Sequence, residues 1–388
     1  MTLPKLSARA KELSPFHVMD ILAQAKQLAE QGKNICHLEI GEPDFVTAEP
    51  VITAGITALK QGKTHYTPAV GLTELRLAVA NYYAEKFSLN IDPRRIIITP
   101  GASGALQLVI ACLLDAGENV LLADPGYPCN QNIAQVFAVE GIAVPVDAES
   151  SYQLDARLLA QHWNKQTRAA MVATPSNPTG TLLPKKQLAE LVKLLEKKQG
   201  HLIVDEIYQG LVYEGEEYTV LEVSDDCFVI NSFSKYFGMT GWRVGWLVVP
   251  ESYVDAIDRI AQNIFLAPPT VSQYAAVTAL HRDTRHILDN RRDEFKTRRD
   301  FLLPALQQMG FEIKAKPQGA FYIYANCERF TDDSFNWAKK LLSQQGVALA
   351  PGIDFGNYQA ERHCRFAYTQ SLLVLEQAVE KIEAFIRT

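Results

Sequence analysis

The chain has 388 residues, of which 47% are hydrophobic and 21% are charged, and its formal net charge is -6. This length and apolar content predict one large domain with a sizeable core and a smaller second one, while the acidic balance disfavours a protein that binds nucleic acid through a basic face. The six cysteines form no Cys-x-x-Cys pair, so we expect neither a disulfide framework nor a metal site, and free thiols are typical of a reducing compartment.

Strand-like apolar runs alternate with helix-like stretches through much of the chain. Residues 184–199 predict an amphipathic helix, because Leu188, Leu191 and Leu195 recur on one helical face and Gly200 is a typical stop signal. The alternation indicates βαβ units, so the expected fold class is α/β, with a mainly parallel sheet flanked by helices. Strands are expected at residues 95–99, 119–123, 169–174, 201–204, 228–231 and 243–249, with a helix at residues 103–114 after the first of them.

The last hundred residues have a different pattern. A long helix is expected at residues 283–308, and a short strand at residues 320–325 follows it. We interpret this region as a smaller α+β domain that packs with the N-terminal segment. The predicted division is a large domain at residues 46–285 and a small domain made of residues 1–45 and 286–388, although no linker marks the boundary.

Lys235 is the first residue that points to chemistry. It follows the apolar strand expected at residues 228–231, where an ammonium group is costly to desolvate. One solution is a reactive amine, which burial keeps neutral or which condenses with a carbonyl group. Ser232 and Arg243 lie close to it in the sequence, and both can donate hydrogen bonds to a phosphate. The alternative is an ordinary surface lysine.

Two further segments lie where strands end, which is where open α/β sheets bind their ligands. Residues 100–104 (PGASG) lead from a strand into a helix, so backbone N–H groups and the helix dipole favour an anion there. Asp205 follows the strand at residues 201–204, and a buried carboxylate needs a cationic partner such as a protonated pyridine nitrogen. The simpler explanations are a glycine-rich turn without a ligand and, for Asp205-Glu206, part of a metal site.

These segments together resemble the class I/II aminotransferases of fold type I, which use pyridoxal 5'-phosphate (PLP). The most specific segment is residues 231–245 (NSFSKYFGMTGWRVG), in which Ser-x-x-Lys precedes an arginine eight residues after the lysine. The resemblance implies that family's fold, with a seven-stranded, mainly parallel sheet and a small domain that closes over the active site. Further segments that match, in chain order, are GEPDF at 41–45, HYTP at 65–68, PGASG at 100–104, DPGYP at 124–128, SNPTG at 176–180, VDEIY at 204–208 and HCRFA at 363–367.

The resemblance also implies a role for each matched residue. Lys235 is the expected catalytic residue, which holds PLP as a Schiff base and shuttles protons. The residues implied to bind the cofactor are Ala102, Ser103, Ser232 and Arg243 around its phosphate, Tyr127 stacked on its ring, Asn177 and Tyr208 at its phenolic oxygen, Asp205 at its ring nitrogen, and Tyr66. The residues implied to bind substrate are Gly41, Asn177 and Arg365, the last as a clamp on the α-carboxylate. Taken singly, Tyr127, Asn177 and Arg365 also fit a core aromatic, a proline turn and a surface charge.

The implied function is the exchange of an amino group between an L-amino acid and a 2-oxo acid by a ping-pong mechanism, which would make the protein a transaminase of amino acid metabolism. Tyr66 is implied to reach the cofactor phosphate of the neighbouring subunit, so a homodimer is expected. An alternative on the same fold is a PLP-dependent C–S β-lyase, which needs no amino acceptor. The substrates stay open, because family members with acidic, aromatic and small aliphatic substrates share these residues.

Other classes of protein fit less well. A PLP-sensing transcription regulator would need a DNA-binding domain of about 60–80 residues ahead of the segment at 41–45. The segment Ser232-Phe-Ser-Lys235 lacks the partner motifs of a penicillin-binding acylase, and neither a P-loop nor G-x-G-x-x-G occurs. Residues 1–13 contain no apolar signal core, and no stretch approaches the ~20 apolar residues of a membrane helix. We therefore expect a cytoplasmic protein without membrane or nucleic-acid partners.

Overall fold

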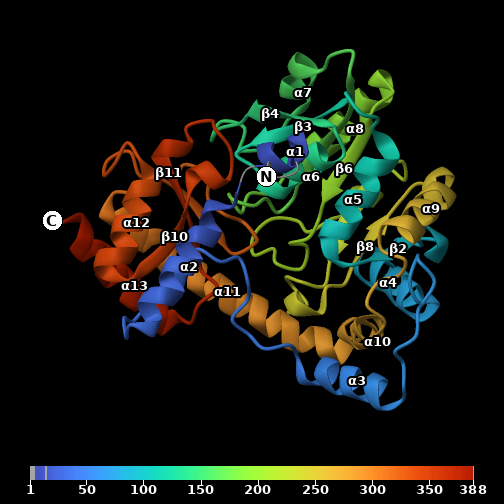
Figure 1. Ribbon diagram of the computed structural model, residues 1–388, viewed down its shortest axis with the longest axis horizontal. Coiled ribbons are helices and arrows are strands. Elements are labelled where there is room, and N and C mark those ends of the chain that lie inside the picture. The colour runs from blue at the N-terminus through green and yellow to red at the C-terminus, as the bar shows by residue number, and fades with distance from the viewer. Residues whose placement is uncertain (1–4, 14, 388) are drawn as a thin grey trace.

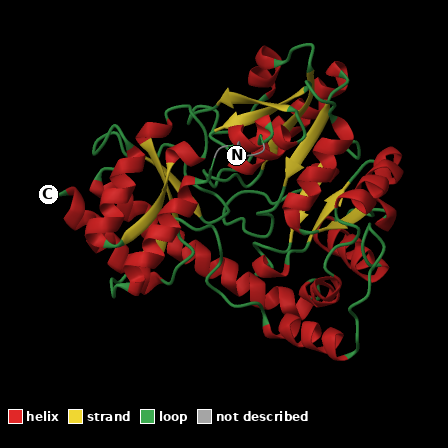
Figure 2. Ribbon diagram, in the orientation of Figure 1, coloured by secondary structure: helices red, strands yellow, loops and turns green. Residues whose placement is uncertain are grey.

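The computed structural model describes residues 5–13 and 15–387, and the strands of this part of the chain form two sheets of seven and four strands. The two sheets are separate, and helices lie outside both of them (Figure 2). The larger sheet lies among green, cyan and yellow segments in Figure 1, whereas the smaller one lies among red and orange segments near the C-terminus. The expected α/β fold class with a seven-stranded sheet is confirmed.

The larger sheet contains β2 (Ile96–Thr99), β3 (Asn119–Asp124), β4 (Glu140–Pro145), β5 (Thr167–Ala173), β6 (His201–Asp205), β7 (Phe228–Ser232) and β8 (Gly245–Val248). Their order across the sheet is β2-β8-β7-β6-β5-β3-β4. Strands β7, β6, β5, β3 and β4 run parallel, and β8 is antiparallel to both of its neighbours. The carboxyl ends of the parallel strands therefore meet at one edge of the sheet, which is where such sheets bind ligands.

Both faces of the larger sheet are apolar and covered by helices. Successive residues of a strand point to opposite faces, so the neighbours Ile97 and Ile98 belong to two different cores. Ile97 packs in a core with α5 (Gly101–Leu113), and Ile98 in a core with α8 (Lys185–Lys198). Apolar runs without alternation are typical of strands buried in this way. The other helices associated with this sheet are α3 (Glu49–Lys60), α4 (Thr73–Phe87), α6 (Pro128–Val136), α7 (Ala156–His162), α9 (Val254–Ile264) and α10 (Thr270–Ala279).

The smaller sheet joins the two ends of the chain. Its strands are β1 (Cys36–Leu38), β9 (Tyr322–Asn326), β10 (Val347–Pro351) and β11 (His363–Ala367), in the order β1-β10-β11-β9. The N-terminal strand β1 pairs parallel with β10, so the N-terminal segment lies on the C-terminal sheet, as we predicted. The helices of this region are α1 (Ala8–Glu12), α2 (His17–Glu30), α12 (Ser334–Gln345) and α13 (Leu372–Ile386).

Helix α11 (Arg282–Met309) has 28 residues and connects the two regions. In Figure 1 it runs from the helices around the smaller sheet to α10 and α3. The predicted boundary between residues 285 and 286 falls inside this helix, and the division into domains stays a prediction. Short 3-10 helices complete the described chain: η1 (Pro93–Arg95), η2 (Val220–Glu222), η3 (Thr240–Trp242), η4 (Glu251–Tyr253), η5 (Gly352–Asp354) and η6 (Ala360–Arg362).

The six strands expected in the large region all occur, with ends that agree within two residues, and so do the three expected helices. The sequence did not predict β4, because this edge strand is largely solvent-accessible and its apolar run, residues 142–144, is only three residues long. It also missed β1, β10 and β11, each of five residues or fewer. Short strands carry little local signal, since their stability comes from pairing with distant segments.

None of the helices in residues 5–13 and 15–387 combines the length and the apolar character that crossing a membrane requires.

The packing of α8 on the large sheet can be tested with Leu191→Ala. Leu191 is fully buried in the core that α8 forms with the sheet, so we expect the free energy of unfolding to fall by about 2–5 kcal/mol. Urea-induced unfolding, followed by circular dichroism, measures this loss. The matched control is Leu373→Ala on α13, whose side chain is 64% exposed and whose removal should change stability by about 0.5 kcal/mol or less. Equal effects of the two substitutions would contradict the packing.

Candidate active site

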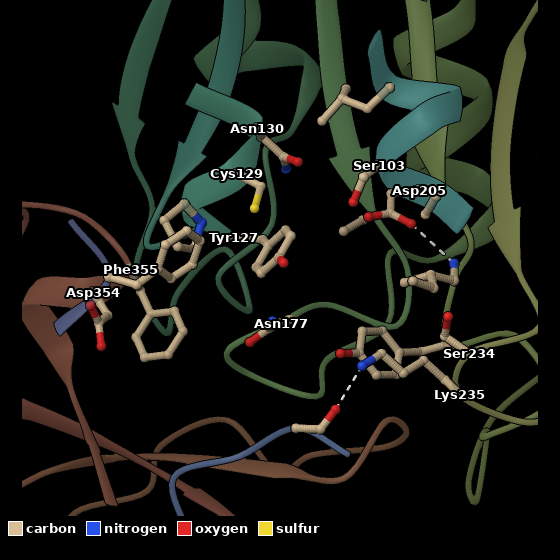
Figure 3. A pocket seen from close by; sticks show the side chains of 18 of the residues that line it. Ser103, Tyr127, Cys129, Asn130, Asn177, Asp205, Ser234, Lys235, Asp354 and Phe355 are labelled. Carbon is tan, nitrogen blue, oxygen red and sulfur yellow. Dashed lines mark hydrogen bonds between the residues drawn. The ribbon is translucent and has the colours of Figure 1, made fainter. Parts of the chain in front are cut away.

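The carboxyl ends of the parallel strands open onto a cavity of about 350 Å³. Strands β5, β6 and β7 lead into Asn177, Asp205 and Lys235, and β3 leads into Tyr127. Figure 3 shows these four side chains around one space. The N-terminal segment and the smaller sheet close the other side, for example through Gly41. Segments that are far apart in the sequence therefore meet here because their strands are aligned.

The N-terminus of α5 forms one end of this cavity. The helix starts at Gly101 without a side-chain cap, so its first backbone N–H groups have no partner within the helix, and Ala102 and Ser103 line the cavity. Gly101 has a φ of 71°, and a Cβ at this position would lie 2.5 Å from Nη2 of Arg243. Free N–H groups, the helix dipole and an arginine together make this end of the cavity suitable for an anion.

Lys235 lies in the middle of the cavity wall. Its Nζ atom donates a hydrogen bond to the carbonyl oxygen of Gly41 at 2.6 Å. Burial lowers the pKa of Lys235 from 10.5 to about 8, and the positive charges of Arg365 and Arg243 contribute to the decrease, while Asp205 opposes it. At pH 7 roughly a tenth of these amines would be neutral, so Lys235 is a better nucleophile and base than an exposed lysine.

Asp205 is the buried carboxylate of the cavity. Burial raises its pKa to about 6, although the backbone N–H of Ile207, which donates to Oδ1 at 3.0 Å, and the charge of Lys235 both favour the ionised form. Its neighbour Glu206 points elsewhere and accepts a hydrogen bond from Thr219 at 3.0 Å. The Asp-Glu pair therefore does not converge on one ligand. A cation inside the cavity would stabilise the ionised form of Asp205.

Arg365, on β11, enters the cavity from the smaller sheet. Its side chain is buried, and it donates from Nη1 to Oδ1 of Asn177 at 2.9 Å and from Nη2 to the carbonyl oxygen of Glu39 at 2.5 Å. The guanidinium carbon lies 4.2 Å from the ring centroid of Tyr322 and 4.7 Å from that of Phe355. Its Nε has no hydrogen-bond partner among the described residues. Two rings thus hold a planar donor group in place, which suits a carboxylate.

Three tyrosines complete the polar lining. The hydroxyl groups of Tyr208 and Tyr322 are 2.7 Å apart and form a hydrogen bond, and burial raises the pKa of Tyr208 well above its ordinary value. Tyr208 is therefore protonated at neutral pH and able to donate a hydrogen bond. Tyr127 is 38% exposed, and the centroid of its ring lies 6.4 Å from that of Phe16.

The structure brings together ten of the twelve residues singled out from the sequence, namely Gly41, Ala102, Ser103, Tyr127, Asn177, Asp205, Tyr208, Lys235, Arg243 and Arg365. It does not place Ser232 and Tyr66 on the cavity wall. The hydroxyl of Ser232 donates to the hydroxyl of Ser234, which itself lines the cavity, at 2.9 Å. Tyr66 is 83% exposed. The cofactor-binding roles of these two residues stay predictions.

Several lining residues were missed from the sequence. Ser234 faces the cavity directly before Lys235, and its position inside the same motif is a signal that could have identified it. Tyr322 and Phe355 lie in segments without any local mark of function. Their role follows from the smaller sheet, which carries them to the large one.

Comparison with known proteins places the chain in a family. Residues 33–382 match the family model described as aminotransferase class I and II. The chain is 36% identical over 384 residues to a (5-formylfuran-3-yl)methyl phosphate transaminase of Methanocaldococcus jannaschii, across 98% of this chain and 99% of that protein. It is 36% identical over 374 residues to a valine–pyruvate aminotransferase of Mycobacterium tuberculosis, across 96% of both chains. The crystal structure of an aminotransferase from M. tuberculosis matches with a TM-score of 0.96, at 35% identity over 99% of both chains.

The fold and the site thus define an enzyme of the fold-type I group, whose members use PLP. The chain belongs to the class I and II aminotransferase family. Its activity is that of an aminotransferase, a transferase of nitrogenous groups.

The lowered pKa of Lys235 predicts how its amine reacts in the cofactor-free protein. Only the neutral amine attacks an aldehyde, so the rate of labelling by pyridoxal should rise with pH through a midpoint at about 8 instead of 10.5. Because the charge of Asp205 raises the pKa of Lys235, Asp205→Asn should move the midpoint to lower pH. Borohydride trapping and mass spectrometry of the peptide that contains Lys235 measure this rate. A midpoint near the ordinary lysine value would contradict the inferred environment.

Proposed function

We propose that this aminotransferase holds PLP on Lys235 and exchanges an amino group between an L-amino acid and a 2-oxo acid by a ping-pong mechanism. The observation that carries the proposal is the environment of Lys235, whose amine has a lowered pKa and shares one cavity with Asp205, Arg243 and Arg365. The amine of Lys235 suits the aldehyde of PLP, and the carboxylate of Asp205 suits its ring nitrogen. The two cations are separate, so that Arg243 can bind the phosphate of PLP and Arg365 the carboxylate of a substrate.

The residues of the cavity fit this cofactor. The phosphate would lie at the N-terminus of α5, against the N–H groups of Ala102 and Ser103 and the guanidinium of Arg243. Close backbone approach is possible there because Gly101 and Gly245 lack a Cβ; at Gly245 a Cβ would lie only 3.0 Å from the backbone nitrogen of Ala102. The space for the phosphate therefore depends on these two glycines, because a side chain at either position would crowd the N-terminus of α5.

The other end of the cofactor also finds partners. Asp205 would pair with the protonated ring nitrogen, which supplies the cation that this buried carboxylate lacks. Tyr208 and Asn177 would donate to the phenolic oxygen, and Tyr127 would cover the ring. When bound, PLP supplies an aldehyde that condenses with amines and a cationic ring that draws electrons from the substrate α-carbon.

Lys235 would act twice. Its amine would hold the cofactor through the aldehyde, and, once replaced there by a substrate amine, it would be available to move a proton. The freed Nζ is neutral in a useful fraction of molecules, since the pKa of Lys235 is lowered to about 8, and it accepts the proton of the α-carbon as a general base. It then returns the proton as a general acid. Asp205 would supply the negative charge that stabilises a protonated ring nitrogen.

Arg365 would orient the substrate. Its fixed guanidinium binds the α-carboxylate, and Asn177, which accepts from Nη1 of Arg365, adds its amide NH₂ group as a second donor. Gly41 accepts from Lys235 and so links the N-terminal segment to the large sheet. We propose that residues 46–285 form the cofactor domain and that residues 1–45 and 286–388 form a small domain that closes over the substrate.

The proposal predicts that Lys235→Ala lacks the absorbance band of the lysine-bound cofactor at the edge of the visible range. It should lower the rate of transamination by about 10³-fold or more, because it removes both the attachment point and the general base. Stopped-flow absorbance and a coupled transamination assay measure the two effects. Borohydride reduction of the native enzyme, followed by peptide mapping, should locate PLP on Lys235.

Lys186→Ala on the exposed face of α8 is the matched control and should behave like the native enzyme. Wild-type turnover in Lys235→Ala would show that another group is the base. Release of pyruvate and ammonia from a cysteine-type substrate without an acceptor, together with no transamination of any amino acid, would instead indicate a β-lyase.

We also propose that the enzyme is a homodimer in which Tyr66 serves the partner's cofactor. Tyr66 is 83% exposed, and Val46 and Leu59, which precede it in the chain, are 77% and 56% exposed. The carbonyl of the preceding residue, His65, accepts a hydrogen bond from Thr270 at 2.7 Å, so this segment is anchored to α10. Exposed apolar side chains around an anchored segment are typical of a surface that another chain covers.

Tyr66→Phe should raise the Kd of PLP by about tenfold or more, because it removes one hydrogen bond to a charged phosphate. Fluorescence titration measures this affinity, and Tyr358→Phe, away from the cavity lining, is the control. In hybrid dimers of Tyr66→Phe with Lys235→Ala, one site would combine the native Tyr66 of one subunit with the native Lys235 of the other. Failure of these hybrids to recover one site with native affinity would exclude sharing across an interface.

A further inference from the structure

The cavity has two chemically different halves. The half beside the large sheet contains Asp205, Lys235 and Arg243, whereas in the half beside the smaller sheet a group of apolar side chains lies next to Glu39, Asp354 and Arg365. We call this group the apolar wall, and its residues are Phe16, Val18, Met19, Ile40 and Phe355. The side chains of Phe16, Val18, Met19 and Ile40 retain solvent exposure, so they present apolar area that a ligand can cover.

The apolar wall surrounds Arg365. The guanidinium of Arg365 lies 4.7 Å from the ring centroid of Phe355, and its Nη2 bonds to the carbonyl oxygen of Glu39, the residue before Ile40. Val18 packs against the cluster that contains Phe355. The guanidinium that would bind an α-carboxylate is therefore flanked by residues of this wall.

The charges in this region disfavour a second carboxylate. Among the described residues that line the cavity, the cations are Lys235, Arg243 and Arg365, and each already has a partner in the proposed function. Two carboxylates lie beside the apolar wall in the described chain: Glu39, whose Oε1 pairs with His37 at 2.8 Å, and Asp354, which is 5% exposed. Asp354 lies next to Phe355 in the chain. Its Oδ1 accepts from the backbone N–H of His17 at 2.7 Å, while its Oδ2 has no partner in the described chain. Figure 3 shows Asp354 and Phe355 across the cavity from Lys235.

We propose that the apolar wall is the side-chain pocket of the amino donor, that it selects L-amino acids with neutral, apolar side chains over dicarboxylic ones, and that Asp354 is a specificity-determining residue. This inference rests on the proposed function, which places the α-carboxylate on Arg365. A dicarboxylic side chain would lose its hydration against the wall without gaining a cation, and the charge of Asp354 would repel it. An apolar side chain meets neither cost and gains by covering exposed apolar surface.

The test compares amino donors on the PLP-loaded enzyme with pyruvate as the acceptor. We expect kcat/KM for phenylalanine, leucine and methionine to exceed that for aspartate and glutamate by about 100-fold or more. Equal or higher values for the acidic donors would overturn the inference, for instance because a partner subunit supplies a cation. Absence of transamination with every donor and with 2-oxoglutarate and oxaloacetate as further acceptors would instead count against the proposed function, so the two failures are distinguishable.

Asp354→Asn isolates the role of the charge. An asparagine side chain still offers an oxygen to the N–H of His17, so α2 should stay in place. We expect the ratio of kcat/KM for aspartate to that for phenylalanine to rise about tenfold, whereas a purely structural defect would lower both values together. The control is Asp20→Asn, which changes an exposed carboxylate on α2 and should leave the ratio unchanged. An unchanged ratio in Asp354→Asn would overturn the role of Asp354.

Met19→Arg provides a second test that does not depend on the stability of Asp354→Asn. Met19 is 56% exposed on α2 and lines the cavity, so an arginine there can extend without repacking a core. It should raise the same ratio by about tenfold or more, because it supplies a cation on the wall. No gain for aspartate or glutamate would show that the wall does not contact the donor side chain.

Discussion

The enclosure of one amine and one carboxylate in a single cavity is the interaction on which the site depends. Burial disfavours the charged form of both groups, so it lowers the pKa of Lys235 to about 8 and raises that of Asp205 to about 6. The two shifts bring both groups close to neutral pH from opposite sides. Lys235 is therefore able to move a proton near neutral pH, which an exposed lysine does less readily. Asp205 is able to bind a cationic partner inside the cavity.

The parallel alignment of the strands creates this enclosure. Asn177, Asp205 and Lys235 follow three neighbouring strands of one sheet, and the sheet is rigid because helices cover both of its faces. The N-terminus of α5 adds an anion site at the same edge. Arg365, however, comes from the smaller sheet and bonds to Asn177 across the cavity. The relative placement of the two sheets, which α11 spans, therefore decides whether the site is complete.

The cofactor half and the substrate half of the cavity have different origins. Strand ends of the large sheet supply the groups that suit PLP, and these belong to long, specific motifs. The apolar wall is assembled from the start of α2, the residues after β1 and the segment around η5. Such loop and helix-end positions tolerate change without loss of the core. This separation gives a physical reason why one family contains transaminases that are named for different substrates.

The sequence by itself determined six of the seven strands of the large sheet and most of the polar site. Apolar runs such as residues 228–231 need no distant partner to be recognised, and the motif around Lys235 is long enough to indicate the family. Tertiary structure alone decided the pairing of β1 with β10, the position of Arg365 between Tyr322 and Phe355, and the apolar wall. The strand pair and the apolar wall join segments more than 300 residues apart, and no local periodicity encodes such contacts, because their energy arises only when the chain has folded.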